Sequence, residues 1–180
     1  MDKPILYIAI GLPASGKSAY FSKLNDLETV CGDTIRREFF GDEGIQLSEG
    51  FLTARGYDLS SLTRQQKEKL CNKLVWDEAK ERALRFLKEG RNVAYDGIHL
   101  RREIRKNVIA SFSPYALIHG LYFVTPLELC IARDRKRKRT IGEARICELS
   151  RFMETPSLEE GFDRLETIDQ NGQRVSLKTR

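Results

Sequence analysis

The stretch that decides the fold is Ile5-Leu6-Tyr7-Ile8-Ala9-Ile10, followed directly by Gly11-Leu12-Pro13-Ala14-Ser15-Gly16-Lys17-Ser18. The apolar run, bounded by Pro4 and Gly11, predicts a strand buried on both faces, as in a parallel sheet. The eight residues after it match the pattern G-x-x-x-x-G-K-[ST], which forms a phosphate-binding loop when it lies between a strand and a helix. The sequence therefore predicts a P-loop.

The composition of this loop suits a triphosphate. Glycines let backbone N–H groups converge on phosphate oxygens, and the helix that follows points its positive end at the same anion. We expect Lys17 to reach the β- and γ-phosphates and Ser18 to offer its hydroxyl to Mg²⁺. ATP and Mg²⁺ are thus the expected ligands of residues 11–18.

The bulk composition is that of a globular domain. The chain has 180 residues, 41% of them hydrophobic and 32% charged, with a formal net charge of +5. That length suits one domain. The first apolar run is too short for a membrane span, so no membrane partner is expected, and the composition does not predict an oligomeric state. The four cysteines form no metal-binding pattern and suit a reducing cytoplasm: Cys31, Cys71, Cys130 and Cys147.

Periodicity and turn residues predict an alternation of strands and helices. We expect a single domain over residues 1–168, with an irregular excursion at 41–62, a lid region at 133–152 and a polar C-terminal tail at 169–180. The fold class is α/β, a P-loop kinase fold with a central parallel sheet of about five strands flanked by helices and a helical, arginine-bearing lid. Expected strands are 5–10, 29–31, 92–95, 115–124 and 162–168, and expected helices are 18–24, 34–40, 63–88, 101–112, 126–139 and 143–152.

Three classes of P-loop protein compete, and the sequence favours a kinase. A GTPase carries N-K-x-D for guanine, which is absent from this sequence. A motor ATPase ends a strand in Asp-Glu, whereas the third expected strand ends in Tyr95-Asp96-Gly97, without an adjacent glutamate. A kinase instead needs a carboxylate near the acceptor and arginines over the γ-phosphate.

Candidates for the carboxylate lie at strand ends, where ligands of open α/β sheets bind. Asp33 follows the second expected strand and Asp96 ends the third. Asp33 could act as general base, or it could cap the helix that follows. Arg36 and Arg37 come within one helical turn of Asp33, and one of them could clamp an acceptor phosphate. Asp96 could support Mg²⁺ through water or orient the acceptor.

A basic run supplies the candidate arginines. Residues 133–139, Arg-Asp-Arg-Lys-Arg-Lys-Arg, contain six basic residues in seven. Arg133 and Arg137 are four positions apart, so on a helix they share a face and could neutralise the transferring phosphoryl group. The remaining cations could bind the backbone of a nucleic acid or simply face solvent.

Over roughly residues 4–168 the chain resembles the phage-type polynucleotide 5′-hydroxyl kinases. The D-x-x-R motif of that family matches Asp33-Thr34-Ile35-Arg36, its strand-end aspartate matches Asp96, and its lid motif R-[ND]-x-x-R matches residues 133–137. The resemblance implies that Asp33 is the general base, that Arg36 holds an acceptor phosphate, and that the acceptor is the 5′-OH end of DNA or RNA. A phage-encoded enzyme of this kind would act in the host cytoplasm.

The resemblance leaves other acceptors open. The wider group includes kinases of seryl-tRNA, of hydroxymethylated bases in phage DNA, and of nucleotide sugars, the last being the zeta toxins. Nucleosides are a further small acceptor. A nucleotide-dependent binding module or ATPase, with no phosphoryl acceptor, is the alternative from another class. The arginines at 133 and 137 and the missing glutamate after Asp96 argue against it.

Overall fold

The structure is a computed structural model that describes residues 3–41 and 45–180. The chain divides into two compact units. Unit 1 comprises residues 1–29 and 86–180, and unit 2 comprises residues 30–85. Each unit is described by itself. The expectation that residues 1–168 form a single domain stays a prediction.

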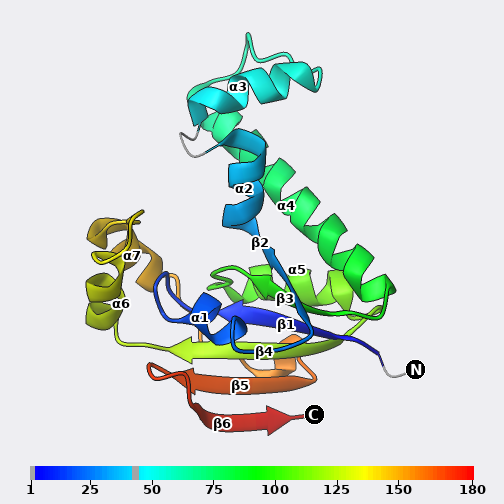
Figure 1. The fold of residues 1–180 in the computed structure, drawn as a ribbon, viewed down its shortest axis with the longest axis vertical. Coiled ribbons are helices and arrows are strands. Elements are labelled where there is room, and N and C mark those ends of the chain that lie inside the picture. Colours follow the sequence, from blue (N-terminus) through cyan, green and yellow to red (C-terminus); the bar gives the residue numbers. More distant parts are fainter. Residues whose placement is uncertain (1–2, 42–44) are drawn as a thin grey trace. The chain divides into compact units, whose positions relative to one another are not determined.

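The described strands form one six-stranded sheet (Figure 1), with the strand order β2-β3-β1-β4-β5-β6. Its strands are β1 (Ile5–Ile10), β2 (Leu27–Cys31), β3 (Asn92–Asp96), β4 (Leu117–Val124), β5 (Arg164–Asp169) and β6 (Arg174–Thr179). β1 pairs in parallel with β3 and β4, and β4 pairs in parallel with β5. The α/β P-loop fold is thereby confirmed.

The central strands are continuously apolar in sequence because they are buried. Leu6, Ile8 and Ile10 of β1 are fully buried, and so are Val93 of β3 and Ile118 of β4. One part of the core joins the sheet to α1 (Lys17–Phe21) through Phe21, which packs with Ala9 and Phe123. Burial of a side chain as large as phenylalanine contributes roughly 1.5–3 kcal/mol. This packing fixes α1, and with it the end of the P-loop, on the sheet.

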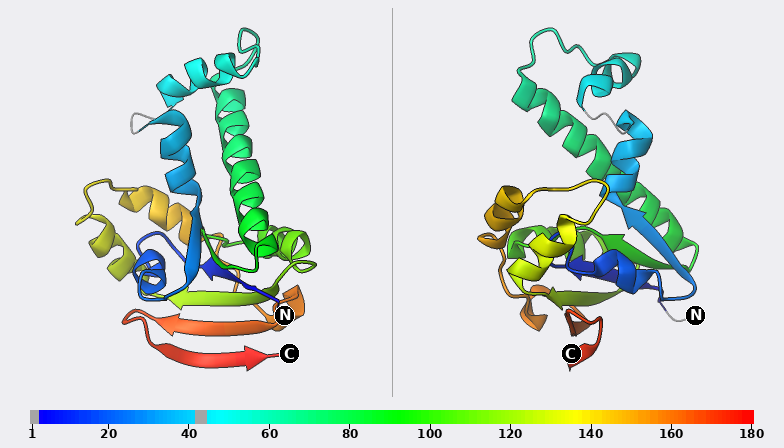
Figure 2. Two further views of the ribbon diagram at one scale, coloured as in Figure 1. Left: turned by 45° about the vertical axis from the view of Figure 1, so that its right-hand side comes forward. Right: turned by 60° about the vertical axis from the view of Figure 1, so that its left-hand side comes forward.

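The other helices of unit 1 are α5 (Arg102–Phe112), α6 (Leu127–Asp134), α7 (Glu143–Ser150) and the short 3₁₀ helix η1 (Leu158–Glu160). Figure 2 shows α6 and α7 beyond the end of β4, on the same side of the unit as the loop between β1 and α1. A cluster of Leu12, Leu100, Cys130 and Ile146 packs these helices against the P-loop. The lid region that carries the arginines is therefore held against the P-loop by apolar packing.

The C-terminal residues differ from the expected polar tail. Residues 174–179 form β6, which pairs antiparallel with β5, so the sheet is mixed. The turn between them is held by Asp169, whose carboxylate accepts hydrogen bonds from the backbone N–H of Asn171 at 2.9 Å and of Gln173 at 2.8 Å. Every side chain of β6 is exposed, including Val175 and Leu177, which alternate with polar residues along the strand.

Unit 2 is helical. It contains α2 (Gly32–Phe40), α3 (Ile45–Ala54) and most of α4 (Arg64–Lys88). Residues 45–54 thus form a helix where an irregular excursion over 41–62 was expected, and residues 42–44 of that excursion lie outside the described residues. The reason is packing: Phe51 stacks on Phe39 of α2 at a ring distance of 4.9 Å, and Leu52 is fully buried. These contacts outweigh the low helix propensity of the glycines and serines nearby.

The start of α4 follows the prediction. The side chain of Gln66 accepts a hydrogen bond from the N–H of Thr63 at 2.7 Å, and the Thr63 hydroxyl accepts one from the N–H of Gln66 at 3.3 Å. This reciprocal pair is a capping box. Along the helix, Arg82 makes ion pairs of 2.6 Å with both Glu38 of α2 and Glu78. No helix within residues 3–41 and 45–180 is both long and apolar enough to cross a membrane.

Candidate functional site

The P-loop folds around the side chain of Lys17. The Lys17 ammonium donates hydrogen bonds to the carbonyl oxygens of Leu12 at 2.6 Å and Gly11 at 3.1 Å, and to the Ser15 hydroxyl at 3.5 Å. The lysine is only 8% exposed. A buried ammonium is stabilised by such oxygens, and phosphate oxygens, which carry charge, satisfy it better.

Glycine is required at two points of the loop. Gly16 adopts a φ of 104°, which side chains rarely adopt. At Gly11 the limit is space, because an added Cβ would lie 3.1 Å from the carbonyl oxygen of Phe123 and 3.0 Å from its Cβ. The hydroxyl of Thr125, just after β4, donates to the Ser15 carbonyl at 2.9 Å. The loop is thus pressed against the end of β4.

The two residues expected to hold Mg²⁺ are in contact. The Ser18 hydroxyl donates to a carboxylate oxygen of Asp96 at 3.0 Å, joining the first turn of α1 to the end of β3. Hydroxyl and carboxylate oxygens are ligands that Mg²⁺ accepts, usually together with phosphate oxygens and water. Within the described residues, no three His, Cys, Asp or Glu side chains cluster as a metal site would. The oxygens of Ser18 and Asp96 thus fit a Mg²⁺ site that phosphate oxygens and water would complete.

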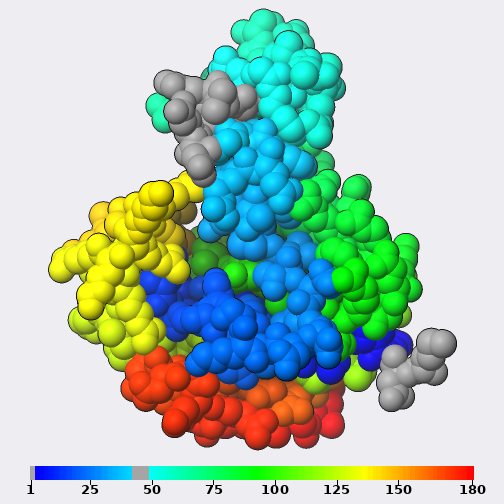
Figure 3. Space-filling view, in the orientation of Figure 1, coloured from blue at the N-terminus to red at the C-terminus, as the bar shows by residue number. Residues whose placement is uncertain are grey.

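A cavity of about 380 Å³ opens over the P-loop. Residues 14–20 form one side, Arg133 and Arg137 face them, and the β5–β6 turn at residues 169–172 closes the end. Figure 3 shows the yellow lid region and the red β5–β6 hairpin beside the blue P-loop and α1, all within unit 1. A cavity of this size fits the 300–1,000 Å³ typical of small-molecule sites.

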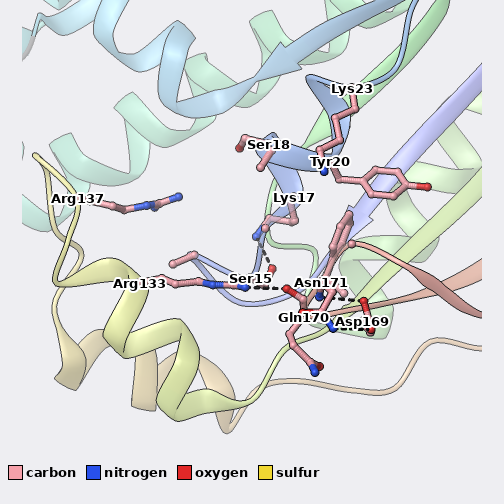
Figure 4. Close-up of a pocket in the computed structure, with 15 residues that line it drawn as sticks. Ser15, Lys17, Ser18, Tyr20, Lys23, Arg133, Arg137, Asp169, Gln170 and Asn171 are labelled. Atoms are coloured by element: carbon pink, nitrogen blue, oxygen red, sulfur yellow. Dashed lines mark hydrogen bonds between the residues drawn. The ribbon is translucent and has the colours of Figure 1, made fainter.

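Both predicted lid arginines point into this cavity (Figure 4). The Arg133 guanidinium donates to the carbonyl oxygen of Gln170 at 2.7 Å. A Cβ on Gly16 would lie 3.8 Å from the same guanidinium, so Arg133 covers the P-loop closely. Lys17 and Lys23 also line the cavity, so four cations face one carboxylate, that of Asp169, and the wall is positive. This is the charge that a triphosphate requires.

The lid is less helical than the sequence indicated. α6 ends at Asp134 rather than continuing to residue 139, so Arg137 lies in the turn after the helix. Two physical causes act together. Like charges four positions apart destabilise a helix, and the buried carboxylate of Asp134 accepts hydrogen bonds from the N–H groups of Ile141 at 3.0 Å and Gly142 at 2.9 Å. Asp134 thereby ties the basic loop to the start of α7.

Asp33 and Arg36 belong to unit 2, so their roles at the phosphate site stay predictions. The structure does decide against one alternative for Asp33. α2 begins at Gly32 with Cys31 as its N-cap, and Asp33 lies exposed inside the first turn. A capping role is therefore excluded. The Arg36 guanidinium donates to the side-chain oxygen of Asn72 on α4, which limits the freedom of that arginine.

Several residues at the site were missed in the sequence. The turn at residues 169–172 lines the cavity but lies in the stretch predicted as a polar tail, although Asn171-Gly172 is a hairpin signal. Tyr20 and Phe123 also line it, and their rings meet edge to face at 5.5 Å. Behind the site, Arg105 of α5 forms a buried ion pair with Glu160 at 2.6 Å. A charged residue in the middle of a helix gives no sign of burial, so sequence alone could not reveal this pair.

A strand, a glycine loop closed on a buried lysine, and a hydroxyl beside a strand-end aspartate define a P-loop nucleotide-binding domain. The sequence pattern of one family, AAA_33, described as an AAA domain, matches residues 6–156. The chain belongs to that family. Its P-loop implies binding of a nucleoside triphosphate, typically with Mg²⁺. No curated protein matches the sequence.

Solved structures with the same fold belong to proteins of different functions. A chain of the Pnkp1/Rnl/Hen1 RNA repair complex superposes with a TM-score of 0.64 at 20% identity, over 85% of this chain and 45% of that one. A chain of the PezAT toxin–antitoxin system of Streptococcus pneumoniae superposes with a TM-score of 0.63 at 13% identity, over 98% of this chain and 72% of that one. A gluconokinase from Sinorhizobium meliloti 1021 superposes with a TM-score of 0.54 at 15% identity, over 94% of this chain and 84% of that one. The chain thus spans less than half the length of that RNA-repair chain.

The buried histidine beside the site gives a pH prediction. His99 is 2% exposed, and its Nδ1 lies 2.7 Å from the Ala9 carbonyl oxygen. Its pKa is lowered to about 4, mainly by burial and also by the nearby charges of Lys17 and Arg105, while the Ala9 contact acts in the opposite direction. The unfolded chain takes up the proton near pH 6.5. The folded state therefore loses stability as pH falls from 6.5 toward 4, by on the order of 2 kcal/mol at pH 4.5.

Urea unfolding of the wild type and His99→Asn between pH 7 and 4.5 measures this effect. Asparagine suits the replacement because it tolerates the positive φ of 35° at this position. We expect the wild type to lose about 2 kcal/mol more than the variant over this range. Parallel pH profiles of the two proteins would show that His99 does not carry the effect.

Proposed function

We propose that this chain is an ATP-dependent kinase that transfers the γ-phosphoryl group of ATP to a hydroxyl group, and that the acceptor is the 5′-OH end of DNA or RNA. One observation carries the kinase assignment. Arg133 and Arg137 line the same cavity as the P-loop, facing Lys17 across it. Cations that converge on a phosphate site stabilise the charge of a transferring phosphoryl group.

In this mechanism the P-loop amides and Lys17 hold the β- and γ-phosphates. Mg²⁺, when bound, neutralises the charge that develops between these phosphates, and Ser18 and Asp96 would hold it. Arg133 and Arg137 stabilise the equatorial oxygens of the transferring group. Asp33 removes the proton from the acceptor hydroxyl, and Arg36 holds a neighbouring phosphate of the acceptor. The acceptor oxygen forms its bond to the γ-phosphorus as the bond to the β-phosphate oxygen breaks, leaving ADP.

Three observations support a nucleic acid as acceptor. The order and spacing of the D-x-x-R and lid motifs resemble those of polynucleotide 5′-hydroxyl kinases. The loop between α6 and α7, residues 135–142, is the lid loop, and it carries Lys136, Lys138 and Arg139 as exposed cations. A chain with the same fold belongs to an RNA repair complex. A small hydroxylated acceptor is the second candidate, because the chain covers 84% of a gluconokinase structure and only 45% of that RNA-repair chain.

Labelled ATP offered with a panel of acceptors tests this proposal. The panel contains 5′-hydroxyl RNA, 5′-hydroxyl DNA, hydroxymethyluracil duplex, nucleosides, a nucleotide sugar, seryl-tRNA and gluconate. We expect label on a 5′-hydroxyl strand, and no transfer by Lys17→Ala, which loses its cation at the phosphates. Label on gluconate or a nucleotide sugar alone would overturn the nucleic-acid acceptor. ATP hydrolysis that no acceptor alters would overturn the kinase.

The role of Asp33 predicts a split between binding and turnover. Asp33→Asn removes the proton acceptor but no phosphate contact, so the affinity for ATP should stay within about twofold while kcat falls at least roughly 100-fold. Asp77→Asn is the matched control, because Asp77 is an exposed carboxylate of α4 that pairs with Lys73 at 2.5 Å. Near-normal turnover of Asp33→Asn would show that another group is the base.

The lid loop predicts salt-dependent binding of the acceptor. Replacing Lys136, Lys138 and Arg139 with glutamine should raise KM for an oligonucleotide and flatten the slope of log KM against log salt by about 2, or about 0.7 for each lost phosphate contact. The control replaces Lys69, Lys73 and Lys80, three exposed cations of α4. An equal change in both triple variants would leave the loop without a specific part in acceptor binding.

A further inference from the structure

The segment that joins Asp96 to α5 is tied directly to the P-loop. Its Ile98 carbonyl oxygen accepts a hydrogen bond from the N–H of Gly11 at 3.2 Å. One residue on, His99 Nδ1 lies 2.7 Å from the carbonyl oxygen of Ala9 in β1. Gly97 leaves no room for a side chain, since a Cβ there would lie 2.7 Å from the His99 ring. The segment that follows Asp96 is therefore attached both to β1 and to the first residue of the P-loop.

The side chain of Arg105 binds the other flank of this segment, where the N–H of Glu154 also donates to the Leu100 carbonyl oxygen at 3.0 Å. Arg105 is fully buried, and its Nη1 donates to the carbonyl oxygens of His99 at 3.1 Å and Leu100 at 2.7 Å. Its Nε and Nη2 donate to the two carboxylate oxygens of Glu160 at 2.6 and 2.7 Å. Glu160 is in turn fixed by the N–H of Ser157 at 3.1 Å. One guanidinium thus links η1 to the residues that follow Asp96.

Stability alone does not explain why this place holds an ion pair. A buried pair costs several kcal/mol of desolvation for each ion, and apolar residues of similar size are often as stable or more so. The pair differs from an apolar contact because its hydrogen bonds are directional. The planar guanidinium can donate to two carbonyl oxygens and a carboxylate at once, in a geometry that lysine cannot reproduce. Directional hydrogen bonds can fix a backbone segment in one position.

We propose that Arg105 is a positioning residue which, braced by Glu160, holds the Gly97–Leu100 segment so that Asp96 and Ser18 stay in the geometry that binds Mg²⁺ with ATP. The inference rests on the proposed function, because it takes Ser18 and Asp96 as the magnesium site. Mg²⁺ demands near-ideal octahedral geometry with short bonds of about 2.0–2.1 Å. A small displacement of Asp96 is therefore enough to weaken the site, and loss of such supporting contacts typically costs about 10–100-fold in metal affinity.

The test compares ATP affinity with and without Mg²⁺, by calorimetry on the full chain. The double variant Arg105→Met/Glu160→Met removes both charges and the guanidinium donors to the His99 and Leu100 carbonyl oxygens, so it leaves no buried charge unpaired. We expect its Kd for ATP in EDTA to stay within about twofold of the wild type. The gain in affinity that Mg²⁺ confers should fall by about 10–100-fold. Thermal unfolding establishes that the variant is folded.

Two further variants keep the outcome decisive. Arg105→Lys retains a cation beside Glu160 but not the fork of donors, so it should lose most of the same Mg²⁺ effect, and it carries the test if the double variant does not fold. Arg91→Met is the control, because Arg91 precedes the other end of β3 and pairs with Glu28 and Glu89. It should leave the Mg²⁺ effect unchanged. An unchanged Mg²⁺ effect in a folded Arg105 variant would overturn the proposal.

Asp96→Asn separates this proposal from the one it rests on. If Asp96→Asn abolishes the Mg²⁺ effect and the Arg105 variants retain it, the positioning role is wrong and the metal site stands. If Asp96→Asn also retains the effect, the metal assignment in the proposed function is wrong, and the role of Arg105 falls with it.

Discussion

The burial of one ammonium group, that of Lys17, is the constraint on which the rest of the site depends. Removing an ammonium ion from water costs several kcal/mol unless oxygen atoms surround it. Here the P-loop supplies two carbonyl oxygens and a hydroxyl within 3.5 Å. Glycine at positions 11 and 16 allows this curl of backbone without the crowding or the strained φ that a side chain would bring. A triphosphate that replaces these neutral acceptors brings negative charge to the lysine, so the same constraint that shapes the loop also favours its ligand.

The remaining parts of the site are held by rigid supports around this loop. On one side the Ser18–Asp96 contact joins α1 to β3, and Arg105 braces the segment behind Asp96. On the other side Asp134 folds the basic loop back onto α7, which keeps Arg133 and Arg137 over the cavity. Preorganised charge of this kind needs little rearrangement when the reaction occurs, and electrostatic stabilisation is most effective under that condition.

Much of this arrangement could be predicted from the sequence because it is encoded locally. The run Ile5–Ile10 and the glycine loop are contiguous, and the capping box at Thr63 and Gln66 spans four residues. Parallel strands bring their carboxyl ends to one edge, so Ser18 and Asp96, 78 positions apart, could be expected to meet. The lid arginines were found from a four-residue spacing, and they reach the same cavity although Arg137 lies beyond the end of the helix.

The parts that were missed depend on contacts between distant residues. Helix 45–54 forms because Phe51 meets Phe39 and Leu52 is buried, and local propensity contains neither fact. The strand at 174–179 gains its hydrogen bonds from β5 while every one of its side chains stays exposed. Its apolar alternation is short, limited to Val175 and Leu177, and the polar residues around it favour a tail. The partnership of Arg105 with Glu160 joins residues 55 positions apart. Such features are set by the assembled core rather than by any short stretch of the chain.

The most direct test of the account is a crystal structure of the full chain with a non-hydrolysable ATP analogue, Mg²⁺ and a 5′-hydroxyl oligonucleotide. The account predicts that Lys17 exchanges the Leu12 carbonyl for phosphate oxygens. It also predicts that the Asp33 carboxylate lies within about 2.6–3.2 Å of the 5′ oxygen, in line with the γ-phosphorus. An analogue bound away from the P-loop, or an Asp33 too far from the 5′ oxygen for proton transfer even through one water, would contradict it.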